Sequence, residues 1–164
     1  MVEHLDEITT DGNFRAKVER LVIDGIGHHY ELRVHNALRS VEKQKQNVAA
    51  GVSKTMRSKH LPGVDGLARG VDVIDSRFNW GAPNQVWLMI GRLALTKGLV
   101  WGGLYGLPRS TRKKLEAFLL DRTKPFDPAK WVTEEGKPGP LGWDPAHVES
   151  ATCKWDWLKG RWNG

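Results

Sequence analysis

Three short segments of the chain each carry a residue of a type that binds zinc. They are Ser58-Lys59-His60, Gly70-Val71-Asp72 and Asp144-Pro145-Ala146-His147. A hydrolytic zinc site takes three protein ligands from histidine and carboxylate side chains and leaves a fourth position for water. His60, Asp72 and His147 can supply these ligands, provided that the fold brings the segments together. Scattered His and Asp residues are also common in polar loops, so the spacing alone leaves both interpretations open.

A carboxylate beside such a site has to accept the proton of the attacking water and later pass it to the leaving amine. Asp144 lies in the same short segment as His147 and is the candidate for this role.

Apolar spacing predicts an α+β fold, a small antiparallel sheet flanked by helices in a single domain. The run Val71-Asp72-Val73-Ile74 indicates a buried strand, and a strand at 147–149 would bring His147 beside Asp72. Ser40 is a typical helix N-cap. We expect helices at 14–23, 41–50, 84–97 and 110–120, and strands at 30–38, 70–75, 99–106 and 147–149.

Four blocks of the sequence, in order, resemble the phage-type L-alanyl-D-glutamate endopeptidases. These are cell-wall endolysins of the D-alanyl-D-alanine carboxypeptidase superfamily of zinc metallopeptidases. The blocks are Arg39-Ser40-Val41-Glu42-Lys43-Gln44, then GVSKTMRSKHLPG with GLARGVDV from Gly51, then WLMIGRLALTKGLVWGG from Trp87, and finally DPAH at Asp144. Four ordered blocks are more specific than any one of them.

The resemblance implies a role for each matching residue. His60, Asp72 and His147 would be the zinc ligands and Asp144 the catalytic base. Arg39 would face the substrate carbonyl, where its permanently charged guanidinium stabilises an oxyanion. Gln44 and Ser58 would contact the substrate; for Arg39, a solvated position at a helix end is the alternative.

Two features depart from the common family pattern. The turn between His60 and Asp72 is longer than usual and contains Asp65, a competing ligand; we prefer Asp72 because a strand positions a ligand more rigidly than a Gly-rich loop. An insert at about 108–142 includes a long Pro- and Gly-containing loop. Loops of this length are often functional, so we expect the insert to flank the active-site cleft, a surface excursion being the alternative.

Composition limits the organisation of the chain. With 164 residues it suits one catalytic domain over 1–164 and leaves no room for a wall-binding module of ordinary size. The single cysteine, Cys153, excludes an intramolecular disulfide and is expected to be a packing residue. The N-terminus, MVEHLDEITT, lacks the basic and apolar regions of a secretory signal, and no stretch is apolar enough to span a membrane.

A net charge of +6 indicates an anionic partner, which fits the bacterial wall and nucleic acid equally well. Trp87 and Trp101 are expected in the core. Trp155, Trp157 and Trp162 lie in the basic tail KWDWLKGRWNG, where they would stack on bases, bind sugar rings or a membrane interface, or cover the core. None of the usual nucleic-acid-binding motifs is present.

The sequence therefore predicts a monomeric endolysin with one Zn²⁺ per chain, an antimicrobial enzyme of phage lysis that hydrolyses peptidoglycan stem peptides. We expect it in the host cytoplasm until another factor releases it to the wall. A D-alanyl-D-alanine carboxypeptidase with the same site, and a non-catalytic wall- or nucleic-acid-binding module, are the alternatives.

Overall fold

The computed structural model describes residues 1–163, so the last residue of the expected domain, 164, lies outside it. Its main feature is a four-stranded antiparallel sheet with the order β1-β2-β4-β3. The strands are β1 (Leu32–Asn36), β2 (Gly70–Asp75), β4 (His147–Glu149) and β3 (Val100–Trp101). The α+β architecture predicted from the sequence is confirmed.

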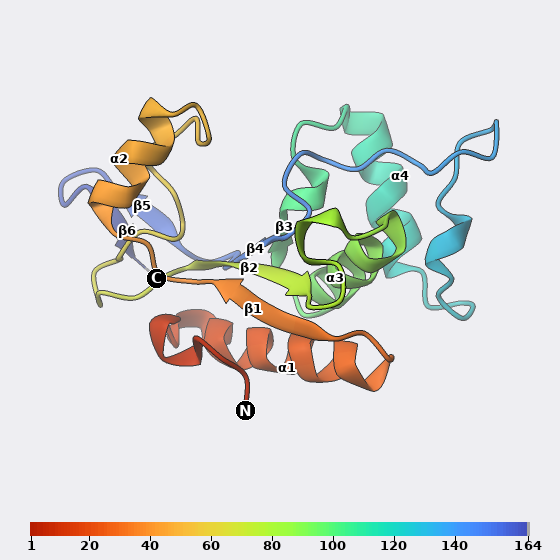
Figure 1. Cartoon of the computed structure of the whole chain (residues 1–164), viewed down its shortest axis with the longest axis horizontal. Coiled ribbons are helices and arrows are strands. Elements are labelled where there is room, and N and C mark those ends of the chain that lie inside the picture. The colour runs from red at the N-terminus through yellow and green to blue at the C-terminus, as the bar shows by residue number, and fades with distance from the viewer. Residues whose placement is uncertain (164) are drawn as a thin grey trace.

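Four helices surround this sheet. Helix α1 (Phe14–Gly27) lies beneath β1 and also packs on α3 (Asn84–Thr96), which in turn contacts β3 (Figure 1). Helix α4 (Arg109–Leu120) packs on the outer side of α3, whereas α2 (Val41–Ala49) stands at the opposite end of the molecule. Short 3-10 turns are present at Leu5–Glu7, Asp11–Asn13, Asn79–Gly81, Gly102–Leu104 and Pro128–Lys130.

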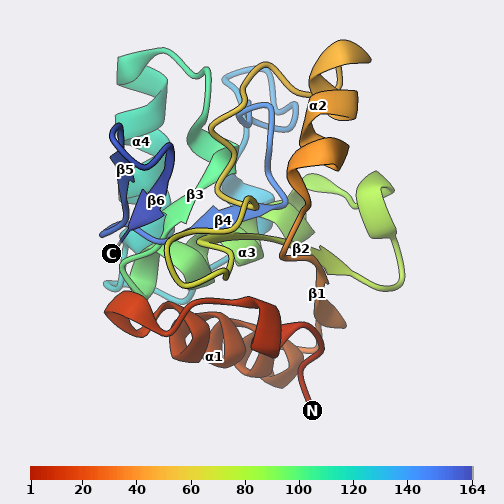
Figure 2. The same ribbon diagram turned by 90° about the vertical axis from the view of Figure 1, so that its left-hand side faces the viewer.

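A small hairpin of β5 (Lys154–Asp156) and β6 (Arg161–Asn163) closes the described chain. In the view turned by 90°, it lies on the side of the molecule opposite α2 (Figure 2). Neither strand of this hairpin was predicted from the sequence.

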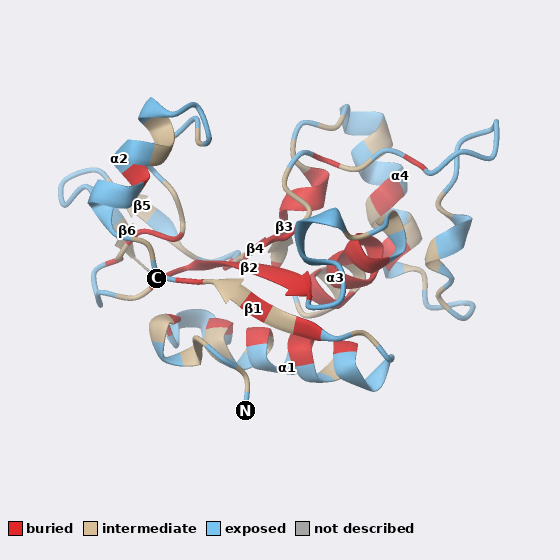
Figure 3. Ribbon diagram, in the orientation of Figure 1, coloured by how far each residue is buried: buried red, intermediate tan, exposed pale blue. Residues whose placement is uncertain are grey.

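The two faces of the central sheet have different surroundings. Strand β2 is buried along its whole length (Figure 3). Val71 pairs with Val148 and Val148 with Trp101, and all three are fully buried. The next pair, Asp72 and His147, therefore projects from the other face, because successive side chains of a strand alternate. At this end of the sheet, one face therefore presents apolar side chains to the core and the other presents Asp72 and His147.

A β-bulge in β1 places Asn36 opposite Asp72. The register changes between Val34, opposite Val73, and Asn36, opposite Asp72, so one extra residue is inserted in β1. Bulges redirect side chains in this way next to functional sites. Here the bulge brings the Asn36 amide to 3.1 Å from the Asp72 carboxylate.

Two predicted boundaries, the end of the first helix and the end of the strand at 99–106, were wrong. Helix α1 continues past Asp24-Gly25 to Gly27, because Asp24 is paired with Arg20 and Lys97 while Gly25 lies against Leu32. The strand expected at 99–106 ends at Trp101, where the chain enters a 3-10 turn. The loop after α4 contains another such turn and a bridge between Val132 and Pro138.

The insert is anchored on α3. Arg92 donates to the carbonyl oxygens of Leu119 (2.6 Å) and Asp121 (3.1 Å), and Asn84 donates to that of Gly139 (3.1 Å). The insert therefore returns to the sheet in a fixed position just before the segment that carries Asp144.

Candidate metal centre and active site

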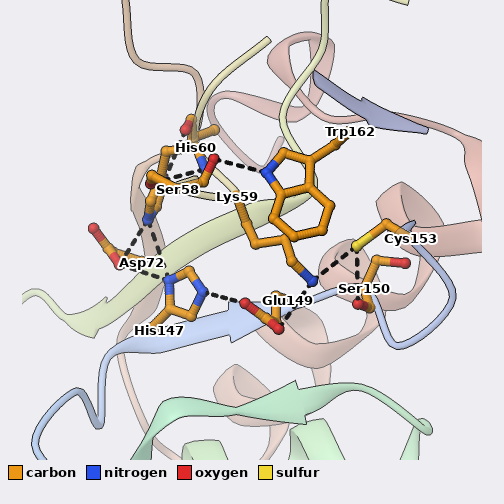
Figure 4. A network of polar contacts seen from close by, with 10 residues as sticks. Ser58, Lys59, His60, Asp72, His147, Glu149, Ser150, Cys153 and Trp162 are labelled. Carbon is orange, nitrogen blue, oxygen red and sulfur yellow. Dashed lines mark hydrogen bonds and ion pairs between the residues drawn. The ribbon is translucent and has the colours of Figure 1, made fainter. Parts of the chain in front are cut away.

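The structure brings His60 to Asp72 and His147, on the face of the sheet that these two residues share (Figure 4). His60 Nε2 lies 3.2 Å from His147 Nδ1 and 3.3 Å from Asp72 Oδ1, and the last two atoms are 3.5 Å apart. All three residues are buried. The register explains part of this convergence, since Asp72 and His147 are directly opposed in neighbouring strands, whereas His60 approaches from a loop.

These separations match a tetrahedral metal site. Zinc binds nitrogen and oxygen ligands at roughly 2.0–2.1 Å, which places two ligand atoms of a tetrahedron about 3.3 Å apart. The three ligand atoms form a triangle of that size and leave the fourth corner for water.

The second nitrogen or oxygen atom of each ligand side chain is hydrogen-bonded to another residue. His60 Nδ1 is 2.8 Å from the Ala37 carbonyl oxygen, His147 Nε2 is 2.9 Å from Glu149 Oε2, and Asp72 Oδ2 accepts from the Asn36 amide. Each outer ring nitrogen thus donates to a fixed acceptor, so the inner nitrogen of each imidazole faces the centre of the triangle, where it can bind a metal ion. This arrangement is typical of metal-bound histidines.

The charges around the triangle favour a cation. Burial opposes ionisation of Asp72, but bonds to His147 and His60 outweigh it and hold the pKa of Asp72 well below its usual range. Burial lowers the pKa of His147, yet contacts with Asp72 and Glu149 raise it to about 9. Without a metal ion, a proton on His147 therefore supplies the positive charge that the site favours.

Asp144 lies at the edge of this site, just ahead of β4. Its carboxyl is partly buried, and this burial raises the pKa of Asp144, assisted by the charge of Asp72 and opposed by His147, His60 and Arg39. No hydrogen bond to this carboxylate occurs among residues 1–163. A partly buried carboxylate with a raised pKa is suited to proton transfer.

Two residues of the Trp-Gly-Gly turn hold the segment that carries Asp144. The buried Trp101 indole donates to the Pro145 carbonyl at 2.7 Å. A Cβ atom on Gly102 would lie 2.2 Å from the Asp144 carbonyl oxygen and 3.0 Å from His147 Cβ. Glycine at this position therefore allows the close approach of the segment to the turn.

The model of one protein family, the phage L-alanyl-D-glutamate peptidases, matches residues 10–94, more than half of the chain. The chain belongs to this family. The matched range includes Arg39, His60 and Asp72, whereas Asp144 and His147 lie beyond it. The family is that predicted from the four sequence blocks, so the protein is a peptidoglycan-hydrolysing peptidase.

The solved structure of the Serratia marcescens L-Ala D-Glu endopeptidase ChiX is similar to this chain, with a TM-score of 0.45 and 21% sequence identity over 90% of this chain and 83% of that one. No curated protein sequence matches the chain. Over the described residues of this phage-type peptidase, no helix is both long and apolar enough to cross a membrane.

The other predicted site residues of this phage-type peptidase occupy different surroundings. Arg39 follows β1 and is half-buried, and its guanidinium donates to Gln44 Oε1 at 2.8 Å. Gln44 is fully buried, and its amide nitrogen donates to Ser53 Oγ (2.9 Å) and the Thr55 carbonyl (2.6 Å). Gln44 therefore contacts Arg39 and the following loop, and its side chain is enclosed rather than open to a ligand.

Ser58 is half-buried next to His60, and its hydroxyl accepts from the His60 backbone N–H at 3.3 Å. The competing ligand, Asp65, lies elsewhere: its carboxylate binds the buried guanidinium of Arg69 and the Thr9 hydroxyl. The preference for Asp72 thus agrees with the position of both carboxylates.

Sequence reasoning missed two residues that bond the candidate ligands, Asn36 beside Asp72 and Glu149 beside His147. Glu149 had a readable signal, since it lies two residues after His147 in a strand and so on the same face. Asn36 had none, because only the bulge brings it opposite Asp72.

Proposed function

We propose that His60, Asp72 and His147 bind one catalytic zinc ion, and that this site cleaves the L-alanyl-D-glutamate bond of peptidoglycan stem peptides. The observation that carries the proposal is the triangle of ligand atoms, 3.2, 3.3 and 3.5 Å apart, with both outer imidazole nitrogens already bonded. A zinc ion held there supplies a Lewis acid for the scissile carbonyl and lowers the pKa of water.

In this proposal Asp144 is the general base and then the general acid. Its carboxylate takes the proton of the attacking water and transfers it to the nitrogen of the departing amine. The raised pKa of Asp144 supports the first step, because a carboxylate that binds its proton more firmly is a better base, and the proton that it accepts is then available to the amine.

Arg39 is proposed to stabilise the negative charge that develops on the carbonyl oxygen. A guanidinium keeps its charge at working pH and offers several donors in fixed geometry. The sequence predicts that Gln44 contacts the substrate. In this proposal Gln44 acts indirectly, because it fixes the guanidinium of Arg39. Ser58, half-buried beside His60, stays in the proposal as a substrate-binding residue.

The same proposal includes a monomeric, single-domain enzyme in which the insert at 108–142 flanks the cleft. Before lysis the enzyme would accumulate in the host cytoplasm, and it would be antimicrobial when applied to exposed wall.

The test compares the native protein with His147→Ala for zinc content and for loss of turbidity of purified peptidoglycan. One zinc per chain and lysis in the native protein, both lost in the folded variant, would support the proposal. Analysis of the products identifies the bond: a new D-glutamate N-terminus is expected, whereas release of terminal D-alanine would indicate a carboxypeptidase. Lysis that persists without metal would refute the zinc site.

A further inference from the structure

The C-terminal hairpin β5–β6 lies against the loop that carries His60. The Trp162 indole donates to the Ser58 carbonyl oxygen at 3.0 Å, and the Trp162 carbonyl accepts from the Val64 backbone N–H at 2.9 Å. One residue of β6 therefore holds the loop on both sides of His60. Trp162 is itself supported by Trp155 of the paired strand, with ring centroids 5.2 Å apart.

Lys59 connects this hairpin to the second histidine. Its ammonium lies 4.3 Å from the centre of the Trp162 ring and 3.1 Å from Glu149 Oε1 (Figure 4). The side chains of Lys59 and Glu149 are each only 15% exposed. Removing one partner of such an enclosed ion pair leaves the other charge poorly compensated, so the two side chains hold each other in place.

Glu149 completes the connection, because its other oxygen, Oε2, is 2.9 Å from His147 Nε2. A Cβ atom on Gly70 would lie 2.7 Å from Lys59 Cβ and 2.8 Å from His147 Cε1, so glycine at this position lets both side chains pack over β2. A continuous series of contacts thus runs from the hairpin through Lys59 and Glu149 to a ligand of the metal centre.

We propose that Trp162, Lys59 and Glu149 are positioning residues, through which the C-terminal hairpin fixes both histidines and thereby sets the affinity of the site for its metal ion. The inference rests on the proposed function only in requiring that a metal binds at His60, Asp72 and His147. The partner of a ligating histidine fixes the tautomer and orientation of the ring, and its loss typically weakens metal binding about 10- to 100-fold.

The experiment measures the zinc dissociation constant of the full chain by competition with a chromogenic chelator. In Glu149→Gln, a neutral amide with only one acceptor oxygen would face two donors, the Lys59 ammonium and His147 Nε2. This variant should weaken zinc binding about 10- to 100-fold. Lys59→Met and Trp162→Phe should also weaken it, and Lys59→Arg should recover much of the loss because it restores the cation.

Trp157→Phe is the matched control, because Trp157 lies in the same hairpin but is 75% exposed. This variant should bind zinc as the native protein does. Thermal unfolding of each variant in EDTA separates the effect on metal affinity from an effect on the fold.

Native-like zinc affinity in Glu149→Gln, Lys59→Met and Trp162→Phe would overturn the inference while leaving the metal site intact. Lower stability in EDTA together with unchanged zinc affinity would also contradict it, since the hairpin would then have only a structural role. Absence of zinc binding in the native protein would instead refute the metal site, and the inference with it.

Discussion

Gly102→Ala is the substitution that most directly tests how closely the catalytic segment must be held. The methyl group would lie 2.2 Å from the Asp144 carbonyl oxygen, 3.1 Å from Asp144 Cβ and 3.0 Å from His147 Cβ. Its nearest neighbour is main chain, which cannot move aside by rotating a bond. Relief to an ordinary contact requires a displacement of about 1 Å in the segment that carries Asp144 and leads to His147.

A misplacement of about 1 Å typically costs a catalytic site about 100-fold in rate. Forcing one extra methyl group into a packed region costs about 1–3 kcal/mol of stability. We therefore expect Gly102→Ala to fold, with a lower midpoint in urea, and to have kcat/KM on muropeptides reduced about 100-fold. Zinc content should fall less than activity, because His60 and Asp72 are supported elsewhere.

Gly81→Ala is the control, because a Cβ atom at Gly81 meets nothing within 4 Å and the residue lies in the short turn after β2. Its activity should equal that of the native enzyme. Activity of Gly102→Ala within about twofold of native would refute the view that close approach of the Asp144 segment is required. Equal losses in both variants would trace the defect to glycine replacement in general.

Four further predictions concern the base, the stability of the metal-free protein, the pH dependence of zinc binding, and the core. Asp144→Asn should keep its zinc but lose about 100- to 10,000-fold in turnover, measured by product release; retained turnover would remove Asp144 from the proton-transfer role. The pKa of His147 is raised to about 9 in the metal-free protein. Protonated His147 therefore stabilises the folded protein. This stabilisation is fully present below pH 6.5, the pKa of histidine in the unfolded chain, and is lost as the pH rises through about 9; urea unfolding in EDTA should show the loss. Zinc affinity should have the opposite trend and fall toward acid pH, because the metal displaces that proton. Leu115→Ala in α4 should destabilise the protein by about 2–5 kcal/mol, since this leucine is fully buried; a loss below 1 kcal/mol would show that α4 is not part of the core.

Much of the fold was predictable because local patterns decide it. Helices α2 and α3 follow the predicted ranges closely, and the Ser40 hydroxyl caps α2 by accepting from the Lys43 N–H at 3.1 Å. Strand β2 agrees with the apolar run around Asp72. Trp87 and Trp101 are buried as expected, since both lie on apolar faces of regular elements.

The unpredicted parts depend on contacts between distant segments. Strand β3 ends early because Gly102 and Gly103 turn the chain beneath the Asp144 segment, and no local pattern records that approach. The C-terminal hairpin is held against the His60 loop by Trp162, a contact between segments about 100 residues apart that no local pattern records. The salt bridge between Lys59 and Glu149 likewise joins residues that are far apart in the sequence.

The two histidines face the metal position through different ring nitrogens, and the architecture gives the reason. His147 and Asp72 are directly opposed in neighbouring strands, where Cβ atoms lie about 4.5–5.5 Å apart, so the His147 atom that meets the Asp72 carboxylate is the ring nitrogen nearer the backbone, Nδ1. His60 comes from a loop and reaches the same point with its distal Nε2, while its Nδ1 is held by a main-chain carbonyl. A slip of one residue between β2 and β4 would turn His147 toward the core and separate it from Asp72. The register of this strand pair, fixed on its other face by Val71 against Val148, therefore determines the site as much as the ligand residues do.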